Sequence, residues 1–336
     1  GPTNTNCGWS QVIWAVYQVG CPLGCQFCAT GAMGFQRNLD YWEIIEQAIF
    51  WARHLKQSGE RLNNVVFMGM GEPLLNYPNV LRAIKILNDK EMFGLGARHI
   101  SISTAGIPEG IKNLYKENIQ LNLAISLHAA NDDLRSRLMP VNKRFPLKIV
   151  LKAVDEYIKK NQGKDILIVL HQMGNHGPAY YKRYPKEFEK FKPVCKSNQL
   201  EECSQEEVSN AYDNAILYTD YFLSKVINFL KPYSNNYETA MFYMSDHGES
   251  LGENGIYLHG LPYFMAPDEQ KHIASLMWMG SKANEEVDAE KLNSYKNNSF
   301  SQDNLFHTLL GLFEVKTEVY KEIIDIRELN KLNNLS

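Results

Sequence analysis

The sequence predicts an α/β fold in two parts, and three observations indicate it. From residue 13 to about residue 174, short apolar segments alternate with segments of helical period, as in parallel strands joined by crossover helices. Hydrophobic residues make up 44% of the 336 residues, which is enough to fill a core. The motif content changes near residue 164, so we expect one part over 1–163 and another over 164–336.

Four apolar segments of the first part have the length and continuity of strands buried on both faces. Helical periodicity follows several of them, so right-handed crossovers and a parallel sheet are expected, either open or curled into part of a barrel. The expected strands are Ile13–Gly20, Asn64–Gly71, His99–Gly106 and Leu121–Ala129, and the expected helices are 42–55, 80–87 and 147–160.

The charge is distributed unevenly between the two parts. Residues 1–163 carry 18 Lys and Arg against 13 Asp and Glu, whereas residues 164–336 carry 17 against 25. The basic excess of the first part is compatible with RNA as a partner, and a solvated surface is the plainer interpretation. No apolar run approaches the ~18 residues of a membrane span, so no transmembrane segment is expected. The leading Gly1-Pro2 looks like a scar from tag removal.

Three cysteines follow the first expected strand with the spacing Cys-x3-Cys-x2-Cys, namely Cys21, Cys25 and Cys28. Clustered thiolates favour zinc or an iron-sulfur cluster. Structural zinc normally has four protein ligands, and Cys7 is the only other cysteine nearby. A 4Fe-4S cluster held by three cysteines keeps one iron open for S-adenosylmethionine (SAM). We favour the cluster, and zinc stays open as the alternative.

The later strands of the first part also end in polar residues. Ligands of parallel α/β sheets bind at the carboxyl ends of the strands, so a site is expected there. Each feature alone has a plainer interpretation, such as a tight turn or a buried structural histidine. The residues concerned are Gly69–Pro73 after the second strand, Ser103 and Thr104 after the third, and Ser126 and His128 after the fourth.

Residues 15 to about 160 resemble the radical-SAM core of the RlmN-type adenine-C2 RNA methyltransferases. The resemblance implies that Cys21, Cys25 and Cys28 hold a 4Fe-4S cluster, and that SAM is reduced to a 5'-deoxyadenosyl radical. It also implies a SAM site lined by Gly71, Glu72, Ser103, Ser126 and His128. The matching segments are QVGCPLGCQFCATGAMGFQRNL, NVVFMGMGEPLLN, ISISTAGI, LAISLHAANDDLR and LMPVNK.

The first part lacks features that the family uses for methyl transfer. The family has a cysteine seven positions before the first cluster ligand, and this chain has Trp14 there. The last third of the barrel, which holds a second cysteine, and the family's N-terminal RNA-binding region are not recognisable. We therefore expect a SAM-binding core that is incomplete for methyl transfer.

The second part opens with another apolar segment, at 165–174, that predicts a buried strand. A capping box at Ser204–Glu207 predicts the start of a long helix that ends near Leu230. A further strand is expected to deliver Asp246 and His247 at its end. The polar loop between Cys195 and Cys203 looks like one closed by a disulfide, which suits an oxidising compartment, whereas a thiolate cluster needs a reducing one.

Metal-ligand residue types gather in this second part. Asp246 and His247, with Glu249 and His259 nearby and His176 after another strand, form a plausible ligand set for zinc. A single histidine is more often structural, and only the clustering favours a site.

Residues 164 to about 320 resemble the catalytic domain of the EptA-type phosphoethanolamine transferases, which have an alkaline-phosphatase-like fold. The resemblance implies that Asp246 and His247 bind zinc, and that His176 and His259 face the phosphoryl group or a second metal. It implies a phospholipid or lipid A partner and a periplasmic location, whereas the first part implies a cytoplasmic one. The matching segments are ILIVLHQMGNHGPAYYKRYP, YDNAILYTD, SDHGESLGENGIYLHGLPY and SQDNLFHTLLGL.

This second match is also partial, because the family's nucleophilic threonine and its glutamate zinc ligand are not recognisable. Three functions stay open. The first is a radical-SAM core that binds a 4Fe-4S cluster and SAM. The second is part of a zinc-dependent lipid A phosphoethanolamine transferase of the colistin-resistance type, and the third is a folded chimera without catalysis.

Overall fold

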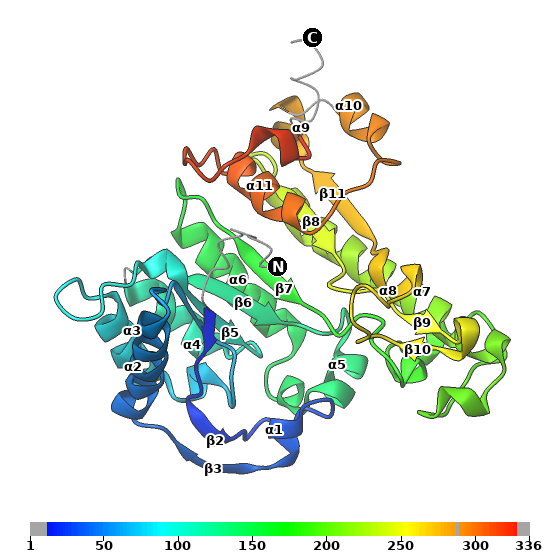
Figure 1. Cartoon of the computed structure of the whole chain (residues 1–336), viewed down its shortest axis with the longest axis horizontal. Helices are drawn as coiled ribbons and strands as arrows, with labels where there is room; N and C mark the ends of the chain where they lie inside the picture. The colour runs from blue at the N-terminus through cyan, green and yellow to red at the C-terminus, as the bar shows by residue number, and fades with distance from the viewer. Residues whose placement is uncertain (1–11, 118, 287–288, 328–336) are drawn as a thin grey trace. The chain divides into compact units, whose positions relative to one another are not determined.

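The expected parallel sheet forms in the first half of the chain (Figure 1). The computed structural model describes residues 12–117, 119–286 and 289–327. Five strands pair in the order β1-β4-β5-β6-β7, and every pair is parallel. The strands are β1 (Val12–Trp14), β4 (Asn64–Phe67), β5 (Ile100–Thr104), β6 (Asn122–Ser126) and β7 (Ile168–His171).

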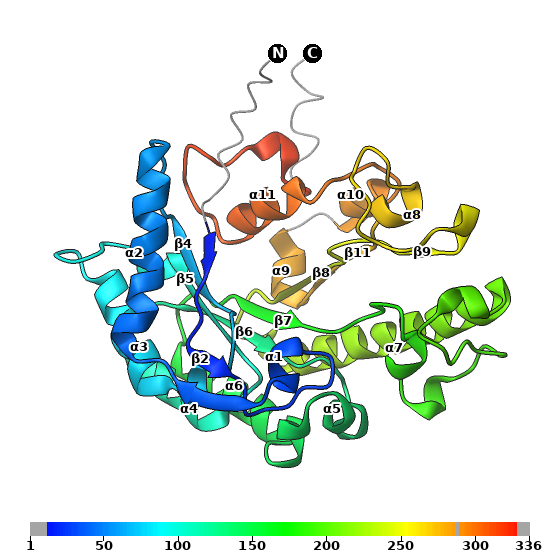
Figure 2. The ribbon, with the colours of Figure 1, turned by 60° about the horizontal axis from the view of Figure 1, so that its bottom comes forward.

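Amphipathic helices connect these strands and bury their apolar stripes. Figure 2 shows α2 beside α3, and these two helices pack together, as do α4 and α6. Ile44, Ala48, Val80 and Ile84 are among the residues that α2 and α3 bury. The helices are α1 (Ala29–Ala32), α2 (Tyr41–Gln57), α3 (Tyr77–Asn88), α4 (Pro108–Leu114), α5 (Asp132–Leu138) and α6 (Leu147–Lys160).

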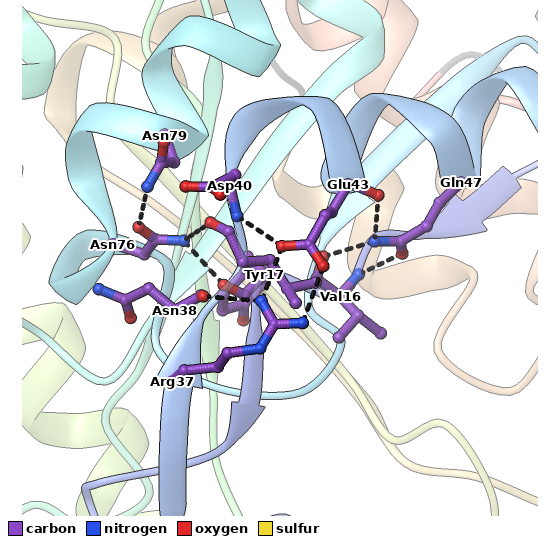
Figure 3. Close-up of polar contacts among 10 residues, drawn as sticks. Val16, Tyr17, Arg37, Asn38, Asp40, Glu43, Gln47, Asn76 and Asn79 are labelled. Carbon is purple, nitrogen blue, oxygen red and sulfur yellow. Dashed lines mark hydrogen bonds and ion pairs between the residues drawn. The ribbon is translucent and has the colours of Figure 1, made fainter.

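The single strand expected over Ile13–Gly20 is wrong, because the chain forms two strands there. After β1, strand β2 (Gln18–Gly20) leaves the parallel sheet and pairs antiparallel with β3 (Phe35–Asn38). Between them the Gln47 side chain donates to the Val16 carbonyl and accepts from the Val16 N–H, both at 2.8 Å (Figure 3). A side chain from α2 thus satisfies backbone groups that a continuous strand would offer to its neighbours.

The strand expected over 165–174 forms as β7 and extends the same sheet. Its pairing with β6 runs from Leu123 opposite Ile168 to Ser126 opposite His171. The expected burial on both faces is wrong, since Val169 and His171 are exposed. Half-buried and exposed residues alternate along β7, and because successive side chains of a strand point to opposite faces, one face of this edge strand is not covered.

The described chain divides into two compact units. The first runs to Lys196 and includes Asn210–Tyr218, and the second takes Ser197–Ser209 and the described residues from Thr219 on. Helix α7 (Gln205–Leu230) therefore contributes residues to both units. Its start agrees with the expected capping box, in which the Ser204 N–H donates to Glu207 Oε2 at 2.8 Å and the Glu207 N–H donates to Ser204 Oγ at 3.3 Å.

The second unit contains short antiparallel strand pairs and small helices. Strand β8 (Ala240–Met244) pairs with β11 (Ser275–Met279), and β9 (Ser250–Leu251) pairs with β10 (Tyr257–Leu258). None of the helices within the described ranges has the length and apolar character that crossing a membrane requires. The remaining helices are α8 (Asp268–Lys271), α9 (Ser281–Glu286), α10 (Ala289–Ser294) and α11 (Asp303–Leu312).

Candidate functional site

The cysteine triplet lies in a tight loop between β2 and α1. The Cys21 N–H donates to the Gly34 carbonyl at 3.0 Å, so the β2–β3 hairpin holds the start of the loop. The Cys28 N–H donates to the Cys25 carbonyl at 3.1 Å, and helix α1 begins directly after Cys28. Cys21 is buried, Cys25 and Cys28 are half-buried, and all three are free thiols.

The three thiols interact electrostatically. Burial, followed by the charges of Cys21 and Cys28, raises the pKa of Cys25 to about 12. Burial also raises the pKa of Cys21, with smaller contributions from Glu72 and Cys28, although a backbone hydrogen bond at Leu23 opposes the shift. Thiolates at these positions therefore need a positive partner, because desolvation and like charge both favour the protonated form. Soft, mutually repelling donors in one loop fit a metal or an iron-sulfur cluster.

Glu72 is buried in the turn that follows β4 and is held by three protein donors. Its Oε1 accepts from Thr104 Oγ1 at 2.7 Å and from the Leu74 N–H at 3.1 Å, and its Oε2 accepts from the Ala105 N–H at 2.7 Å. Burial raises the pKa of Glu72 to about 7, although these hydrogen bonds oppose the shift. Since each carboxylate oxygen has two lone pairs, Oε2 in particular has capacity for a further donor such as an ammonium group.

Polar side chains tie the Glu72 turn to the strand that carries the cysteine loop. The Glu72 N–H donates to Gln18 Oε1 at 2.7 Å, and Gln18 Nε2 donates to Asn38 Oδ1 at 2.8 Å. Asn76 Nδ2 donates to the carbonyls of Tyr17 and Leu39, both at 2.8 Å (Figure 3). Gln18 was not singled out from the sequence, although a buried amide within an apolar strand was a usable signal.

His128 lies beside the cysteine loop at the end of β6. Its ring centroid is 4.6 Å from that of Phe27, which precedes Cys28. The backbone has φ of +58°, which is uncommon for a residue with a side chain. Burial, followed by the charge of His171, lowers the pKa of His128 to about 3. Its Nδ1 is buried and has no hydrogen-bond partner among the described residues, as expected of a group that awaits a ligand.

The other three residues of the predicted SAM site also lie at strand ends of the first unit. Gly71 has φ of +110° in the turn after β4, and a side chain there would collide with Gln18. Ser103 is buried near the end of β5, and Ser126 is half-buried at the end of β6. These positions agree with the expectation that the polar residues meet at one edge of the sheet, whereas their role as ligands stays a prediction.

Arg135 of α5 is a buried residue of this region that the sequence analysis missed. Its guanidinium donates to the carbonyl of Leu127 at 3.1 Å and to that of Ala105 at 2.6 Å, just beyond the ends of β6 and β5. It also donates to Asn142 Oδ1 at 2.6 Å. Its positive charge lowers the pKa of Cys25 against the larger effect of burial. The sequence signal was an arginine next to Leu134 and three residues before Leu138, on the apolar side of a short helix.

In the second unit, four residues of the candidate zinc set contact one another in pairs. The rings of His247 and His259 stack with centroids 3.6 Å apart. His259 Nδ1 lies 3.3 Å from Oε1 of the buried Glu249, and His247 Nε2 lies 3.8 Å from Oδ1 of the exposed Asp246. Imidazole and carboxylate groups are of the types that bind zinc. Strand β8 ends two residues before Asp246, as expected.

His176 belongs to the first unit, after β7. Its Nδ1 lies 2.8 Å from the Gly177 carbonyl, and its own carbonyl accepts from Arg183 Nε at 2.6 Å. Its predicted role opposite His259 stays a prediction. Cys195 and Cys203 are both disulfide-bonded, whereas Cys7 lies outside the described residues.

Two protein-family models match the chain. The Sulfatase model matches residues 110–315, and the Radical SAM superfamily model matches residues 16–176. The matches share residues 110–176, from within α4 to just after β7. An overlap there is understandable, because both folds alternate helices with parallel strands.

Relatives of the two parts are known separately. The chain is 47% identical over 182 residues to phosphoethanolamine transferase EptA of Salmonella typhimurium, which covers 53% of this chain and 33% of that protein. It is 51% identical over 143 residues to ribosomal RNA large subunit methyltransferase N of Nitrosopumilus maritimus, covering 43% of this chain and 41% of that protein. The chain thus spans between a third and about two-fifths of the length of these relatives.

A solved structure also resembles part of the chain. The soluble domain of lipooligosaccharide phosphoethanolamine transferase A from Neisseria meningitidis aligns with a TM-score of 0.50 and 40% identity. The alignment covers 54% of this chain and 55% of that domain. Together with the family models, it supports the two-part architecture of radical-SAM-like and EptA-like regions.

Proposed function

We propose, for a chain that belongs to the Sulfatase family and whose residues 16–176 match the Radical SAM superfamily model, that its first unit binds a 4Fe-4S cluster and SAM. The proposal depends chiefly on one observation. Three free thiols, each half-buried or buried, share a loop beside the buried Nδ1 of His128, which has no partner among the described residues. A soft metal cluster and a polar small molecule together satisfy both sets of groups.

Each residue of the site has a definite task in this proposal. Cys21, Cys25 and Cys28 hold the cluster, which supplies an electron for cleavage of SAM when it is bound. Glu72 accepts from the SAM ammonium through lone pairs that Thr104 and Ala105 leave available. The other predicted residues bind by hydrogen bonds to the ribose or carboxylate, with Gly71 giving close backbone approach. These residues are His128, Ser103 and Ser126.

The proposal concerns binding and does not extend to methyl transfer onto RNA. Trp14 is exposed on β1 at the position where the resembling family has one of the two further cysteines that it uses for methyl transfer. An indole is not a nucleophile of that kind, whereas a thiolate is. RNA binding through the basic first part is a separate proposal that filter binding can test.

Metal analysis after anaerobic reconstitution tests the cluster. The parent is expected to be brown and to contain about four irons with matching sulfide, as a 4Fe-4S cluster requires. Cys25→Ala is expected to lose the iron, and Cys7→Ala is expected to keep it. A colourless, iron-free parent contradicts the proposal, and loss of bound zinc from both variants would instead support a four-thiolate zinc site.

A second candidate function is favoured by the convergence of histidines in the second unit. His247, His259 and Glu249 lie close together beside Asp246, and zinc bound there would act as a Lewis acid towards a phosphate ester. The resemblance to EptA-type enzymes supports a phospholipid or lipid A substrate.

We further propose that the sequence changes origin at residues 163–164, between α6 and β7.

Zinc content tests this second candidate. Asp246→Asn is expected to bind less zinc than the parent at equal free zinc, because a carboxylate ligand is lost. Asp268→Asn, an exposed aspartate on α8, is the matched control and is expected to bind as the parent does. Equal zinc content in all three proteins would contradict a zinc site that includes Asp246. A cooperative melt with neither iron nor zinc would leave the chain as a folded chimera without catalysis.

A further inference from the structure

Five consecutive residues of the second unit, Leu261–Met265, are exposed, and we call this segment the apolar tip. Tyr263 is 81% exposed, Phe264 85% and Met265 61%. Single exposed apolar residues are ordinary in folded proteins. A contiguous group that includes two aromatic rings indicates an interaction surface.

The apolar tip is a formed turn. The N–H groups of Met265 and Ala266 both donate to the Pro262 carbonyl, at 2.8 and 2.9 Å. The Ala266 side chain is buried. Because the turn satisfies these backbone donors internally, it can present its side chains outward without exposing unpaired donors to an apolar partner.

The apolar tip is anchored to the segment that carries the candidate zinc ligands. Before it, Gly260 follows His259 directly in the chain. After it, the Gln270 carbonyl accepts from the Gly248 N–H at 3.0 Å, and Gln270 Nε2 donates to Ser250 Oγ at 3.0 Å. Contact at the tip therefore lies on the same unit as His247 and His259, and close to them in sequence.

The chemistry of the apolar tip fits a lipid surface. Three prominent side chains fall far short of the roughly 20–30 residues a side that a stable protein interface uses. A bilayer deforms around a projecting group, and tyrosine at headgroup level has its ring in apolar surroundings and its hydroxyl in water. At the base of the tip, Lys271 Nζ lies 5.6 Å from the Tyr263 ring centroid and 3.2 Å from Asp268 Oδ1. This pair of opposite charges complements a zwitterionic headgroup, which offers phosphate and ammonium together.

We propose that the apolar tip docks this chain onto phospholipid bilayers with zwitterionic headgroups, with Phe264 and Met265 entering the acyl boundary. The interaction is peripheral and needs neither metal nor cofactor. It goes beyond the proposed ligand sites, and metal-free protein suffices to test it. Its failure is thus distinguishable from failure of the cluster or zinc proposals.

Co-sedimentation with vesicles of phosphatidylcholine and phosphatidylethanolamine tests the docking. The double variant Phe264→Ser/Met265→Ser is expected to lower the partition coefficient about tenfold or more, because two buried apolar side chains are lost. The matched control is Phe50→Ser/Met92→Ser, since those residues are 64% and 66% exposed in the first unit. It is expected to bind as the parent does. Far-UV circular dichroism checks that both variants fold.

Three results would overturn this proposal. One is equal partitioning of the tip variant and the parent. Another is binding that requires anionic lipid and disappears in high salt, because the apolar tip would then not be the source of affinity. The third is vesicle-independent self-association of the parent, seen by light scattering and abolished in the tip variant, which would make the tip a protein interface.

Discussion

His128 and His171 lie edge to face, with ring centroids 5.1 Å apart, across the β6–β7 pair. The N–H groups of Leu127 and His128 both donate to the His171 carbonyl, at 3.1 and 3.2 Å. These residues come from either side of the expected change of sequence origin at 163–164. A strand of the second sequence part thus completes the environment of a predicted SAM-site residue of the first.

The buried imidazole of His128 predicts acid sensitivity of the first unit. Its pKa is about 3 in the folded chain against an ordinary 6.5, so the folded state favours the neutral ring. The resulting stabilisation is complete above pH 6.5 and is lost as the pH falls towards 3. Between pH 6.5 and 4.5 we expect the free energy of unfolding to fall by roughly 2 kcal/mol from this group.

His128→Asn is the variant that isolates this effect, because asparagine tolerates the left-handed backbone at this position. Urea unfolding followed by tryptophan fluorescence reports mainly on the first unit, which holds Trp14, Trp42 and Trp51, whereas Trp278 is the only described tryptophan of the second unit. The variant is expected to lose that share of the pH dependence. An unchanged slope between pH 6.5 and 4.5 would show that His128 titrates normally.

Glu72 predicts the opposite dependence on pH. Its folded pKa of about 7 lies above the ordinary 4.5, so its contribution is fully present below pH 4.5 and is lost as the pH rises through 7. From pH 5 to pH 8 the parent is expected to lose roughly 3 kcal/mol through this group.

Glu72→Gln removes the charge, but its amide N–H₂ then faces the Thr104 hydroxyl or the Ala105 N–H, which both donate to the carboxylate in the parent. The variant is expected to be less stable than the parent at pH 5 by about 1–3 kcal/mol, and the gap is expected to close by pH 8. Urea titrations at both pH values measure it. A gap that does not depend on pH would count against a buried, titrating Glu72.

The buried guanidinium of Arg135 is expected to stabilise the first unit through its fixed fork of donors. Arg135→Lys leaves the carbonyls of Leu127 and Ala105 and the Asn142 side chain incompletely satisfied, because lysine cannot reproduce the fork. We expect a loss of about 2–4 kcal/mol in the free energy of unfolding. Arg137→Lys, an exposed neighbour on α5, is the control and is expected to change it little. Equal effects of the two substitutions would refute the assigned role.

The Ser204 cap predicts a local effect at the start of α7. Ser204→Ala removes the acceptor of the Glu207 N–H and is expected to cost about 1 kcal/mol. Hydrogen exchange, followed by mass spectrometry on peptides over the first turn of α7, should show protection reduced about fivefold. Ser209→Ala, within the same helix, is the control, and protection reduced equally by both variants would exclude a specific capping effect.

Local patterns predicted the elements whose structure depends on local interactions. Helix α6 matches the expected 147–160 residue for residue, and α7 begins at its capping box. The break between β1 and β2 was missed because it depends on Gln47, which is 31 residues from Val16 in sequence. The exposure of β7 was missed because sequence period cannot tell an edge strand from a central one.

The residues of the candidate sites also differ in whether local sequence or tertiary packing determines their position. The cysteine loop follows from a short spacing, and the strand ends follow from the β-α order. Arg135 and Gln18 were missed because their importance comes from carbonyls and amides that tertiary packing supplies. The closeness of Glu249 to His259 depends on loop geometry that no local pattern encodes.

Mössbauer spectroscopy of protein reconstituted with ⁵⁷Fe, recorded with and without SAM, tests the proposed cluster site most directly. We expect the spectrum of a 4Fe-4S cluster with about four irons per chain, and a changed signal from about one of them when SAM is added. Iron that is absent, or a cluster spectrum that SAM leaves unaltered, would contradict a SAM-binding cluster on Cys21, Cys25 and Cys28.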